Sequence, residues 1–315
     1  MKPEIRFEPL KEMWVVIAPG RQSRPIPIKF DENSHGICPF CPGREEMTPP
    51  EIERVDDGNG GWRIRVIPNK FPALVPEYSR DCKIDGIYHR IDGVGKHELV
   101  IESPEHELDL AKHPLEHIVQ VFRVYQRRYS ELKSISWARH VQIFRNWGPL
   151  AGASLQHPHT QIIALPFVPE YIARELGSME RNGTLCRMVQ KELEDGKRVV
   201  LECENFVAFT PFASRFAFEV WFVPKAHISE LDELDKIGIQ ELARMFKTIV
   251  GRMREILGEF SYNLLFHSFP SRKFHFHVEL TPRIAGLAGF ELGTGVNINT
   301  VLPEEAASKL RGVSC

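Results

Sequence analysis

Two histidines and a glutamine stand at alternating positions in one short stretch of the chain. The stretch covers 156–161, reads QHPHTQ, and runs directly into the apolar segment 162–165. Because side chains alternate between the faces of a strand, His157, His159 and Gln161 are expected to share one face. An imidazole can act as a nucleophile or as a metal ligand near neutral pH. The spacing therefore indicates nucleophilic or metal chemistry rather than a pair of ordinary strand histidines.

A segment rich in small residues comes just before these histidines. It covers 146–154 and reads NWGPLAGAS. Small residues let the backbone approach a ligand closely and can point N–H groups at an anion. Near the N-terminus, Arg21 and Arg24 lie in a loop with Pro and Gly, and they are either phosphate contacts or ordinary surface charges. A phosphate-sized anion beside a reactive histidine is the first hypothesis.

Cys38 and Cys41 are separated by two residues. This gap lets both thiolates reach one metal ion. The alternative is a redox dithiol, which normally stands at the start of a helix. The residues that follow, Pro42 and Gly43, do not resemble the start of a helix. A metal site is favoured, and its other two ligands must come from elsewhere in the chain.

Composition limits the class of protein. The chain has 315 residues, is 43% hydrophobic and 26% charged, and carries a formal net charge of -2. This balance gives no overall attraction to nucleic acid or membranes, and no apolar run is long enough to span a bilayer. The first residues contain no signal-peptide core, so a cytoplasmic protein is expected. Six cysteines in this length do not form a dense disulfide framework.

The elements that must position the histidines recur twice. Apolar residues at helical spacing predict helices over 115–132 and 239–256, and a hairpin is expected over 5–18. The stretch 204–209 resembles 69–74, and 218–227 overlays 97–106 without a gap. His275 and His277 are the counterparts of His157 and His159, while Glu279 stands where the first copy has Gln161.

An internal duplication of the order strand, strand, helix, strand, strand follows from this recurrence. Each copy combines local meanders with one crossover helix, which predicts an α+β fold. We expect units at 1–180 and 181–315, joined through the polar stretch 181–198 and packed into one body. Glutamate suits a cation better than a phosphoryl oxygen, so the first copy is the expected phosphate site.

The whole set of motifs resembles the histidine-triad superfamily, and more closely the galactose-1-phosphate uridylyltransferase family. The resemblance covers nearly the whole chain and is most specific over 146–161. It implies two units with the histidine-triad fold, each an antiparallel sheet with a crossover helix. It also implies a ping-pong transfer of a uridylyl group from UDP-glucose to galactose 1-phosphate. In that reaction His159 matches the nucleophile, and Gln161 matches a donor to a phosphoryl oxygen.

The resemblance also supplies binding residues and metals. Cys38, Cys41, His106 and His157 match a zinc site, and Glu175, His267, His275 and His277 match a second site for zinc or iron. The residues that match substrate contacts are Arg21, Arg24, Asn69, Lys70, Phe71, Asn146, Gly152, Ala153, Ser154, Gln161, Phe290, Glu291 and Asn297.

Several alternatives remain open on the sequence alone. A related phosphorylase or adenylyltransferase acting on ADP-sugars or dinucleoside polyphosphates would use the same histidine. A nucleotide hydrolase would let water resolve the intermediate, and a non-catalytic nucleotide-binding module would be expected to lose His159 or Gln161. The resemblance implies a homodimer, and Trp62 and Tyr88 are aromatic residues without a place in either predicted core.

Overall fold

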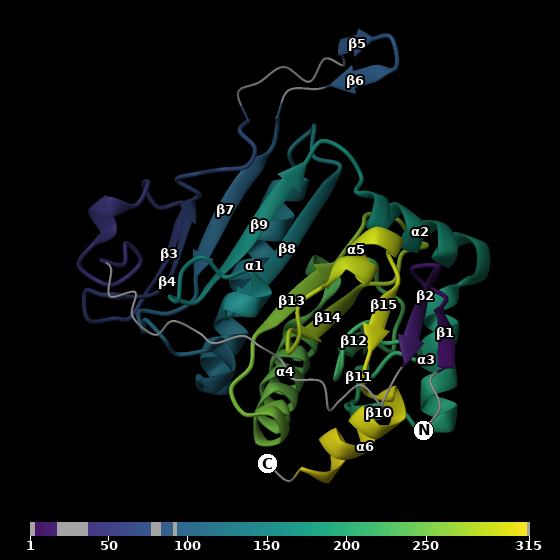
Figure 1. Ribbon diagram of the computed structural model, residues 1–315. Coiled ribbons are helices and arrows are strands. Elements are labelled where there is room, and N and C mark those ends of the chain that lie inside the picture. The colour runs from purple at the N-terminus through teal and green to yellow at the C-terminus, as the bar shows by residue number, and fades with distance from the viewer. Residues whose placement is uncertain (1–3, 18–36, 77–82, 91–92, 314–315) are drawn as a thin grey trace.

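A computed structural model describes residues 4–17, 37–76, 83–90 and 93–313 (Figure 1). Arg21 and Arg24, the predicted phosphate contacts, lie outside the described residues. Within the described part of the chain, no helix is both long enough and apolar enough to cross a membrane.

Ten strands form one large sheet, and every pairing in it is antiparallel. Their order across the sheet is β10-β11-β12-β14-β13-β8-β9-β7-β4-β3. In chain order the strands are β3 (Glu53–Asp56), β4 (Trp62–Pro68), β7 (Lys96–Ile101), β8 (His140–Trp147), β9 (His159–Leu165), β10 (Val199–Glu202), β11 (Phe206–Phe209), β12 (Val220–Pro224), β13 (Tyr262–His267) and β14 (His277–Pro282).

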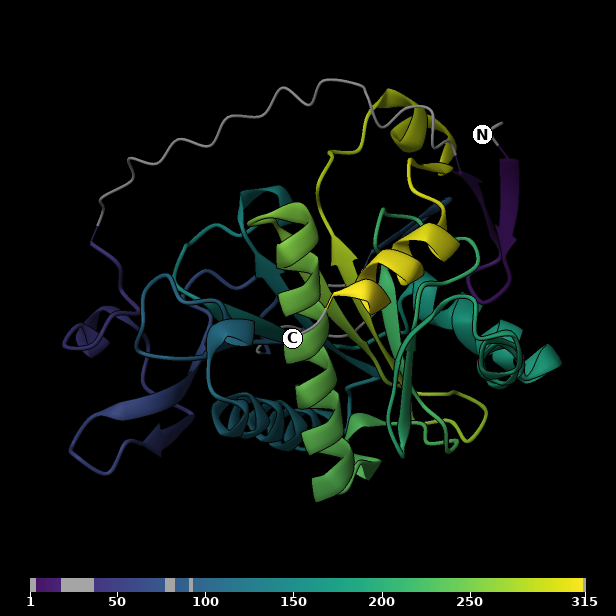
Figure 2. The same ribbon diagram turned by 90° about the horizontal axis from the view of Figure 1, so that it is seen from below.

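The sheet confirms the duplication and the α+β fold. The first copy contributes β3, β4, β7, β8 and β9, and the second contributes β10 to β14. The two halves join where β8 pairs with β13 at the centre of the sheet. Helices α1 (Leu115–Lys133) and α4 (Lys236–Leu257) match the predicted helices and cover one face with a shared apolar core (Figure 2).

The gapless overlay of the two copies is wrong by one residue in the strands. Gln161 pairs with Leu99, and its counterpart Glu279 pairs with Trp221, whereas the overlay places Val220 over Leu99. A one-residue shift reverses which face each side chain occupies. The hydrogen-bonded register therefore shows that Trp221, not Val220, corresponds to Leu99. The second copy is one residue shorter than the first between this position and the histidine that follows the strand.

Two separate layers cover the other face of the sheet. Over the first half, a small apolar cluster joins Cys38 and Phe40 to residues of β4 and β7. Over the second half lie α2 (Glu170–Asn182) and α3 (Thr184–Asp195), which pack on β11 and β12. The polar stretch predicted as a joint thus contains a helix, whose buried apolar stripe includes Leu185 and Val189.

The N-terminal hairpin packs beside the second half of the molecule. Its strands are β1 (Glu4–Glu8) and β2 (Met13–Ile17), and β2 pairs in parallel with β15 (Asn297–Asn299). A second hairpin, β5 (Lys83–Asp85) and β6 (Tyr88–Arg90), stands away from the sheet (Figure 1). In the described segments, the remaining helices are α5 (Gly289–Thr294) and α6 (Pro303–Gly312). The short 3-10 turns there are η2 (Glu45–Met47), η3 (Leu110–Lys112), η4 (Pro149–Ala151) and η5 (Leu231–Glu233).

Candidate active site and metal clusters

His159 is the first residue of β9, and its side chain faces away from α1 and α4. The ring is 7% exposed, and its Nδ1 lies 2.9 Å from the carbonyl oxygen of His157. A carbonyl only accepts hydrogen bonds, so Nδ1 carries the proton and the lone pair is on Nε2. Burial lowers the pKa of His159. The residue therefore presents a neutral, nucleophilic Nε2 at neutral pH.

His157 does not lie on the strand, because β9 begins at His159. His157 and His159 therefore do not belong to one strand as expected, although both rings contact Phe40. The Nε2–H of His157 donates to the carbonyl oxygen of Ser103 at 2.8 Å, which turns Nδ1 toward Cys41. The two imidazoles are thus aimed at different partners by different backbone carbonyls.

A buried polar network holds β9 from behind. Thr160 and Tyr125 each place a hydroxyl within 2.8 Å of the carboxylate of Glu102, and the two hydroxyls are 2.7 Å apart. The Arg145 guanidinium bonds the same carboxylate at 2.9 Å and Asp109 at 3.0 Å. Glu102, Tyr125 and Arg145 were not predicted from the sequence. The opposite charges of Glu102 and Arg145 compensate each other, which lets the network fasten β9 inside the core.

Gln161 is oriented by a residue that the sequence reading missed. The Nε2 of His97 lies 3.0 Å from Oε1 of Gln161, and Nδ1 of His97 faces the N–H of Ala73 at 3.5 Å. In this tautomer the ring donates to the amide oxygen of Gln161 and accepts from the backbone. The amide nitrogen of Gln161 then remains available as a donor. The signal was present in the sequence, since His97 lies near the start of β7, the strand that pairs with β9.

The small-residue segment is anchored to the second copy. The amide nitrogen of Asn263 on β13 donates to Asn146 at 2.8 Å and to the carbonyl of Ala151 at 2.9 Å. Gly148 has a positive φ of 78°, and a Cβ there would lie 2.3 Å from the Ser261 side chain. Only glycine allows this close approach. The segment containing the predicted Gly152, Ala153 and Ser154 is therefore fixed at its base by β13.

The other predicted substrate contacts fall on several elements. Asn69 places its amide nitrogen 3.3 Å from Nδ1 of His97, while Lys70 donates to the carbonyl of Met47 at 3.2 Å. Phe71 is 83% exposed. Phe290 and Glu291 lie in α5, and Asn297 lies in β15 beside the N-terminal hairpin. The structure thus brings Asn69 to the His97–Gln161 pair and leaves the last three on elements of the second half.

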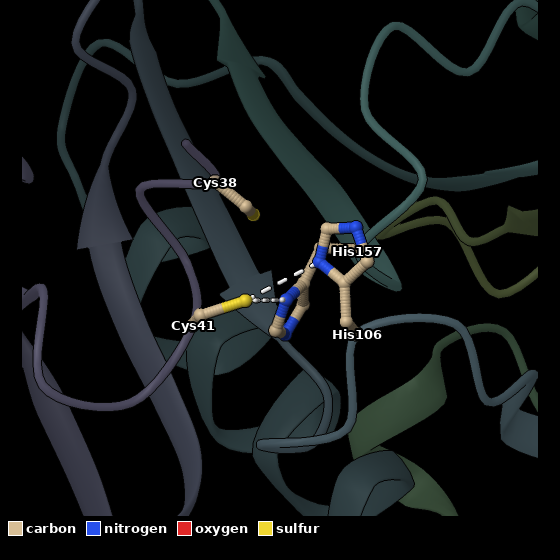
Figure 3. A group of neighbouring side chains, drawn as sticks. All are labelled: Cys38, Cys41, His106 and His157. Carbon is tan, nitrogen blue, oxygen red and sulfur yellow. Dashed lines mark hydrogen bonds between the residues drawn. The ribbon is translucent and has the colours of Figure 1, made fainter. Parts of the chain in front are cut away.

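The four predicted ligands Cys38, Cys41, His106 and His157 converge on one point (Figure 3). Their donor atoms all lie within 4.8 Å of one another. Sγ of Cys41 is 3.3 Å from Nδ1 of His106 and 3.6 Å from Nδ1 of His157. Burial lowers the pKa of His157 to about 4, so its ring is neutral. Two cysteine sulfurs and two imidazole nitrogens are a donor set that can hold a metal ion tetrahedrally.

Phe40 connects this cluster to His159. It lies between the two cysteines, and its ring packs edge-on against His157 and His159 at centroid separations of 6.0 and 5.5 Å. Fixing the cysteine loop therefore fixes the apolar wall that buries His159. This burial is the main cause of the lowered pKa of His159.

The second predicted metal site is assembled only in part. The prediction that His275 belongs to it is wrong. Glu175, His267 and His277 gather with Glu279, whereas His275 joins a different group. β14 begins at His277, so the alternation of strand side chains does not extend to His275. The Nε2–H of His275 donates to the carbonyl of Pro224 at 2.9 Å, which turns Nδ1 toward Cys186.

A lysine ammonium lies inside the Glu175 group. Lys11, from the N-terminal hairpin, is 2% exposed, forms an ion pair with Glu279 and lies 3.7 Å from Glu175. Burial alone would raise the pKa of Glu279, but the charges of Lys11 and Arg215 hold it well below its usual value. In the second copy, the position that matches Gln161 is thus an ionised carboxylate bound to internal cations.

Comparisons with known proteins identify a family and two kinds of relative. A family model described as galactose-1-phosphate uridyl transferase, N-terminal domain, matches residues 1–169, and a model of a domain of unknown function matches 107–312. The ADP-glucose phosphorylase of Arabidopsis thaliana is 33% identical over 99% of this chain and 93% of its own length. The galactose-1-phosphate uridylyltransferase of Thermotoga maritima is 32% identical over 98% of both.

Solved structures give the same two groups of relatives. The crystal structure of the Arabidopsis thaliana ADP-glucose phosphorylase with bound ADP-glucose aligns over 100% of both chains with a TM-score of 0.86. A uridylyltransferase structure aligns over 98% of this chain and 97% of its own with a TM-score of 0.77 and 29% identity.

Proposed function

This chain belongs to the galactose-1-phosphate uridyl transferase family, and we propose that it moves a nucleotidyl group from a nucleotide sugar to an acceptor through His159. The single observation that carries the proposal is the hydrogen bond from His159 Nδ1 to the carbonyl of His157. It leaves the buried Nε2 without a proton and ready to attack phosphorus.

The proposed reaction has two displacements. In the first, Nε2 of His159 attacks the α-phosphorus, a P–N bond forms, and the P–O bond to the sugar 1-phosphate breaks. In the second, an oxygen of the acceptor attacks the same phosphorus and releases the histidine. Gln161 donates its amide N–H to a non-bridging oxygen that gains charge in each transition state. Dividing the transfer into two steps makes each displacement easier.

Two versions of the substrate pair fit this chemistry. In the first, the donor is UDP-glucose and the acceptor is galactose 1-phosphate, so that the products are glucose 1-phosphate and UDP-galactose. In the second, the donor is ADP-glucose or a dinucleoside polyphosphate and the acceptor is inorganic phosphate. The likeness to the Arabidopsis thaliana ADP-glucose phosphorylase, at 33% identity and a TM-score of 0.86, favours testing the second version alongside the first.

The test uses each donor labelled on its α-phosphate. The protein is mixed with labelled UDP-glucose or ADP-glucose, and acid-labile label on the protein is measured before and after galactose 1-phosphate or phosphate is added. We expect one donor to label the protein and one acceptor to remove the label. Release without an acceptor would indicate a hydrolase, and no label from either donor would contradict the proposal.

His159→Ala should abolish labelling, because it removes the proposed nucleophile. His277→Ala, at the matching position of the second copy, should still be labelled. An adduct on the His159→Ala protein would show that the nucleophile is assigned wrongly. Far-ultraviolet circular dichroism of both variants checks that each one is folded.

We also propose that Cys38, Cys41, His106 and His157 hold zinc. The convergence of their donor atoms supports this assignment. The ion would lock the loop that carries Phe40 and would fix His157 two residues before the nucleophile. Structural zinc of this kind contributes directly to folding stability.

A further inference from the structure

A second group of cysteine and histidine side chains lies in the C-terminal half, away from β9. Sγ of Cys186 on α3 is 3.1 Å from Nδ1 of His227 and 3.3 Å from Nδ1 of His275. The three donor atoms lie within 4.8 Å of one another. Three soft or borderline donors at this separation match the ligand preferences of zinc.

Both imidazoles are held in the tautomer that a metal requires. The Nε2–H of His227 donates to the carbonyl of Arg272 at 3.0 Å, and that of His275 donates to the carbonyl of Pro224 at 2.9 Å. Each Nδ1 therefore turns its lone pair toward Cys186. Backbone carbonyls that orient metal-binding histidines in this way are the usual outer partners of such sites.

The internal duplication relates this group to the Cys38 cluster. His275 is the counterpart of His157, since each stands two residues before the matched histidine that begins β14 or β9. His227 likewise follows β12 as His106 follows β7. Cys186 precedes β10, the outermost strand of its copy, as Cys41 precedes β3. Three of the four ligand positions therefore recur.

The fourth position differs between the copies. Cys38 stands three residues before Cys41, and the residue three before Cys186 is Gly183. A Cβ added at Gly183 would meet no atom within 4 Å. Gly183 lines a cavity of about 330 Å³ together with all three donors, and the cavity is also lined by Arg272 and Lys273.

We propose that Cys186, His227 and His275 form a metal site with an open coordination position. The metal is bound by three protein atoms among the described residues, and its fourth position faces the cavity beside Gly183. Sites with three protein ligands keep the fourth for water or an exogenous ligand. Arg272 and Lys273 favour a small anion there. This inference does not depend on the nucleotidyl transfer proposed above.

Cobalt reports the coordination of such a site. The full-length protein is loaded with Co²⁺, its metal content is measured, and the visible d–d bands are recorded during titration with azide. We expect azide to shift the bands of the wild type. Cys186→Ser should bind one equivalent of metal fewer and lose the azide response, while the Cys38 cluster keeps its own metal.

Substitutions at Gly183 distinguish azide binding at an open coordination position of the metal from azide binding elsewhere in the cavity. Gly183→Cys restores the fourth thiolate and should abolish the azide response while keeping the metal content of the wild type. Gly183→Ala imposes the same backbone demand without a ligand and should still respond. A wild-type spectrum that azide leaves unchanged, or equal metal content in wild type and Cys186→Ser, would overturn the proposal.

Discussion

At the scale of single residues, His97 determines whether the oxygen or the nitrogen of the Gln161 amide is available to a ligand. The ring of His97 bonds the amide oxygen at 3.0 Å, so the amide nitrogen is directed elsewhere. Without this contact the oxygen and nitrogen of the amide could exchange places by rotation. The direction of one hydrogen bond therefore determines whether Gln161 can stabilise a negatively charged phosphoryl oxygen.

Gln161→Ala should slow formation of the nucleotidyl-protein adduct without abolishing it. Loss of one donor to a developing oxyanion costs about 2.7–4 kcal/mol, or roughly 10²–10³ in rate. Gln161→Glu places a negative charge beside the phosphoryl group and should be slower than alanine at pH 7, recovering in part as acid protonates the carboxyl. Single-turnover labelling across pH measures both. A glutamate variant as fast as wild type at pH 7 would exclude action on the phosphoryl oxygen.

His97→Phe should slow the same step by about tenfold, because it removes one hydrogen bond of about 1–1.5 kcal/mol that holds the amide. His97→Gln keeps a side-chain N–H donor and should restore part of the rate. In a Gln161→Ala background the substitution should have little further effect, because nothing remains to be oriented. Single-turnover rates of the wild type, His97→Phe, His97→Gln, Gln161→Ala and the double variant of His97→Phe with Gln161→Ala test this. Independent, additive losses would mean that His97 acts on something other than Gln161.

At the scale of elements, a buried ammonium helps to fasten the N-terminal hairpin to the second half. Lys11 follows β1 and places its ammonium against Glu279 on β14 and near Glu175 on α2. The ammonium also lies over the ring of Trp221, with Nζ 5.3 Å from the ring centroid. The pair of strands β1 and β2 is thus held both by pairing with β15 and by this ion group.

Lys11→Met should reduce the free energy of unfolding by about 3–5 kcal/mol, because it leaves buried carboxylates without their nearest ammonium. Arg181→Met removes an exposed ion pair with Glu12 on the same hairpin and should cost only about 0–1 kcal/mol. Urea unfolding of both variants measures the difference. Equal losses would show that the buried ammonium contributes no more than a surface charge.

The same group should make stability depend on acid. Burial favours a raised pKa for Glu175, but the charges of His267, Lys11 and His277 outweigh it and lower the pKa to about 2. A carboxyl with a depressed pKa stabilises the fold above its unfolded pKa, and this contribution is lost as pH falls from about 4.5 toward 2. Lys11→Met should therefore flatten the loss of stability across this range.

At the scale of the whole molecule, the two aromatic residues considered for a dimer interface, Trp62 and Tyr88, differ in how far they are exposed. Trp62 is 4% exposed, and its indole N–H donates to Glu45 at 2.8 Å, so it belongs to the core of the first half. Tyr88 and Ile87 are 74% and 83% exposed on the hairpin of β5 and β6, which stands away from the sheet (Figure 1). Of the two predicted aromatics, only Tyr88 remains a candidate contact.

We expect the protein to be a homodimer in which this hairpin takes part. The double substitution Ile87→Asp and Tyr88→Asp should shift the mass seen by light scattering toward the monomer at micromolar concentration. Charged residues at a buried apolar contact lose hydration without gaining a partner. Ile237→Asp, an exposed apolar position on α4, serves as the control. A wild-type protein that is monomeric under these conditions would refute the homodimer.

The sequence alone determined the features that depend on neighbours along the chain. The spacing of apolar residues predicted α1 and α4, and the repeated order of motifs predicted two related halves, because periodicity is a local property. The spacing of Cys38 and Cys41 indicated a metal-binding pair, and the family resemblance added His106 and His157. The fold brings all four together. Gln161 and Glu279, at matched positions, already indicated that the halves differ in chemistry.

Only the tertiary structure decided which distant side chains meet. The Nδ1 atom of His275 faces Cys186, whereas the sequence predicted that His275 would lie with Glu175. Lys11 forms an ion pair with Glu279, and His97 orients the Gln161 amide. These contacts depend on the residues at which β9 and β14 begin and on the register of the strands. A change of one residue in either moves a side chain to the opposite face of the sheet. Motif spacing cannot resolve such a shift, whereas hydrogen bonding between strands far apart in the sequence does.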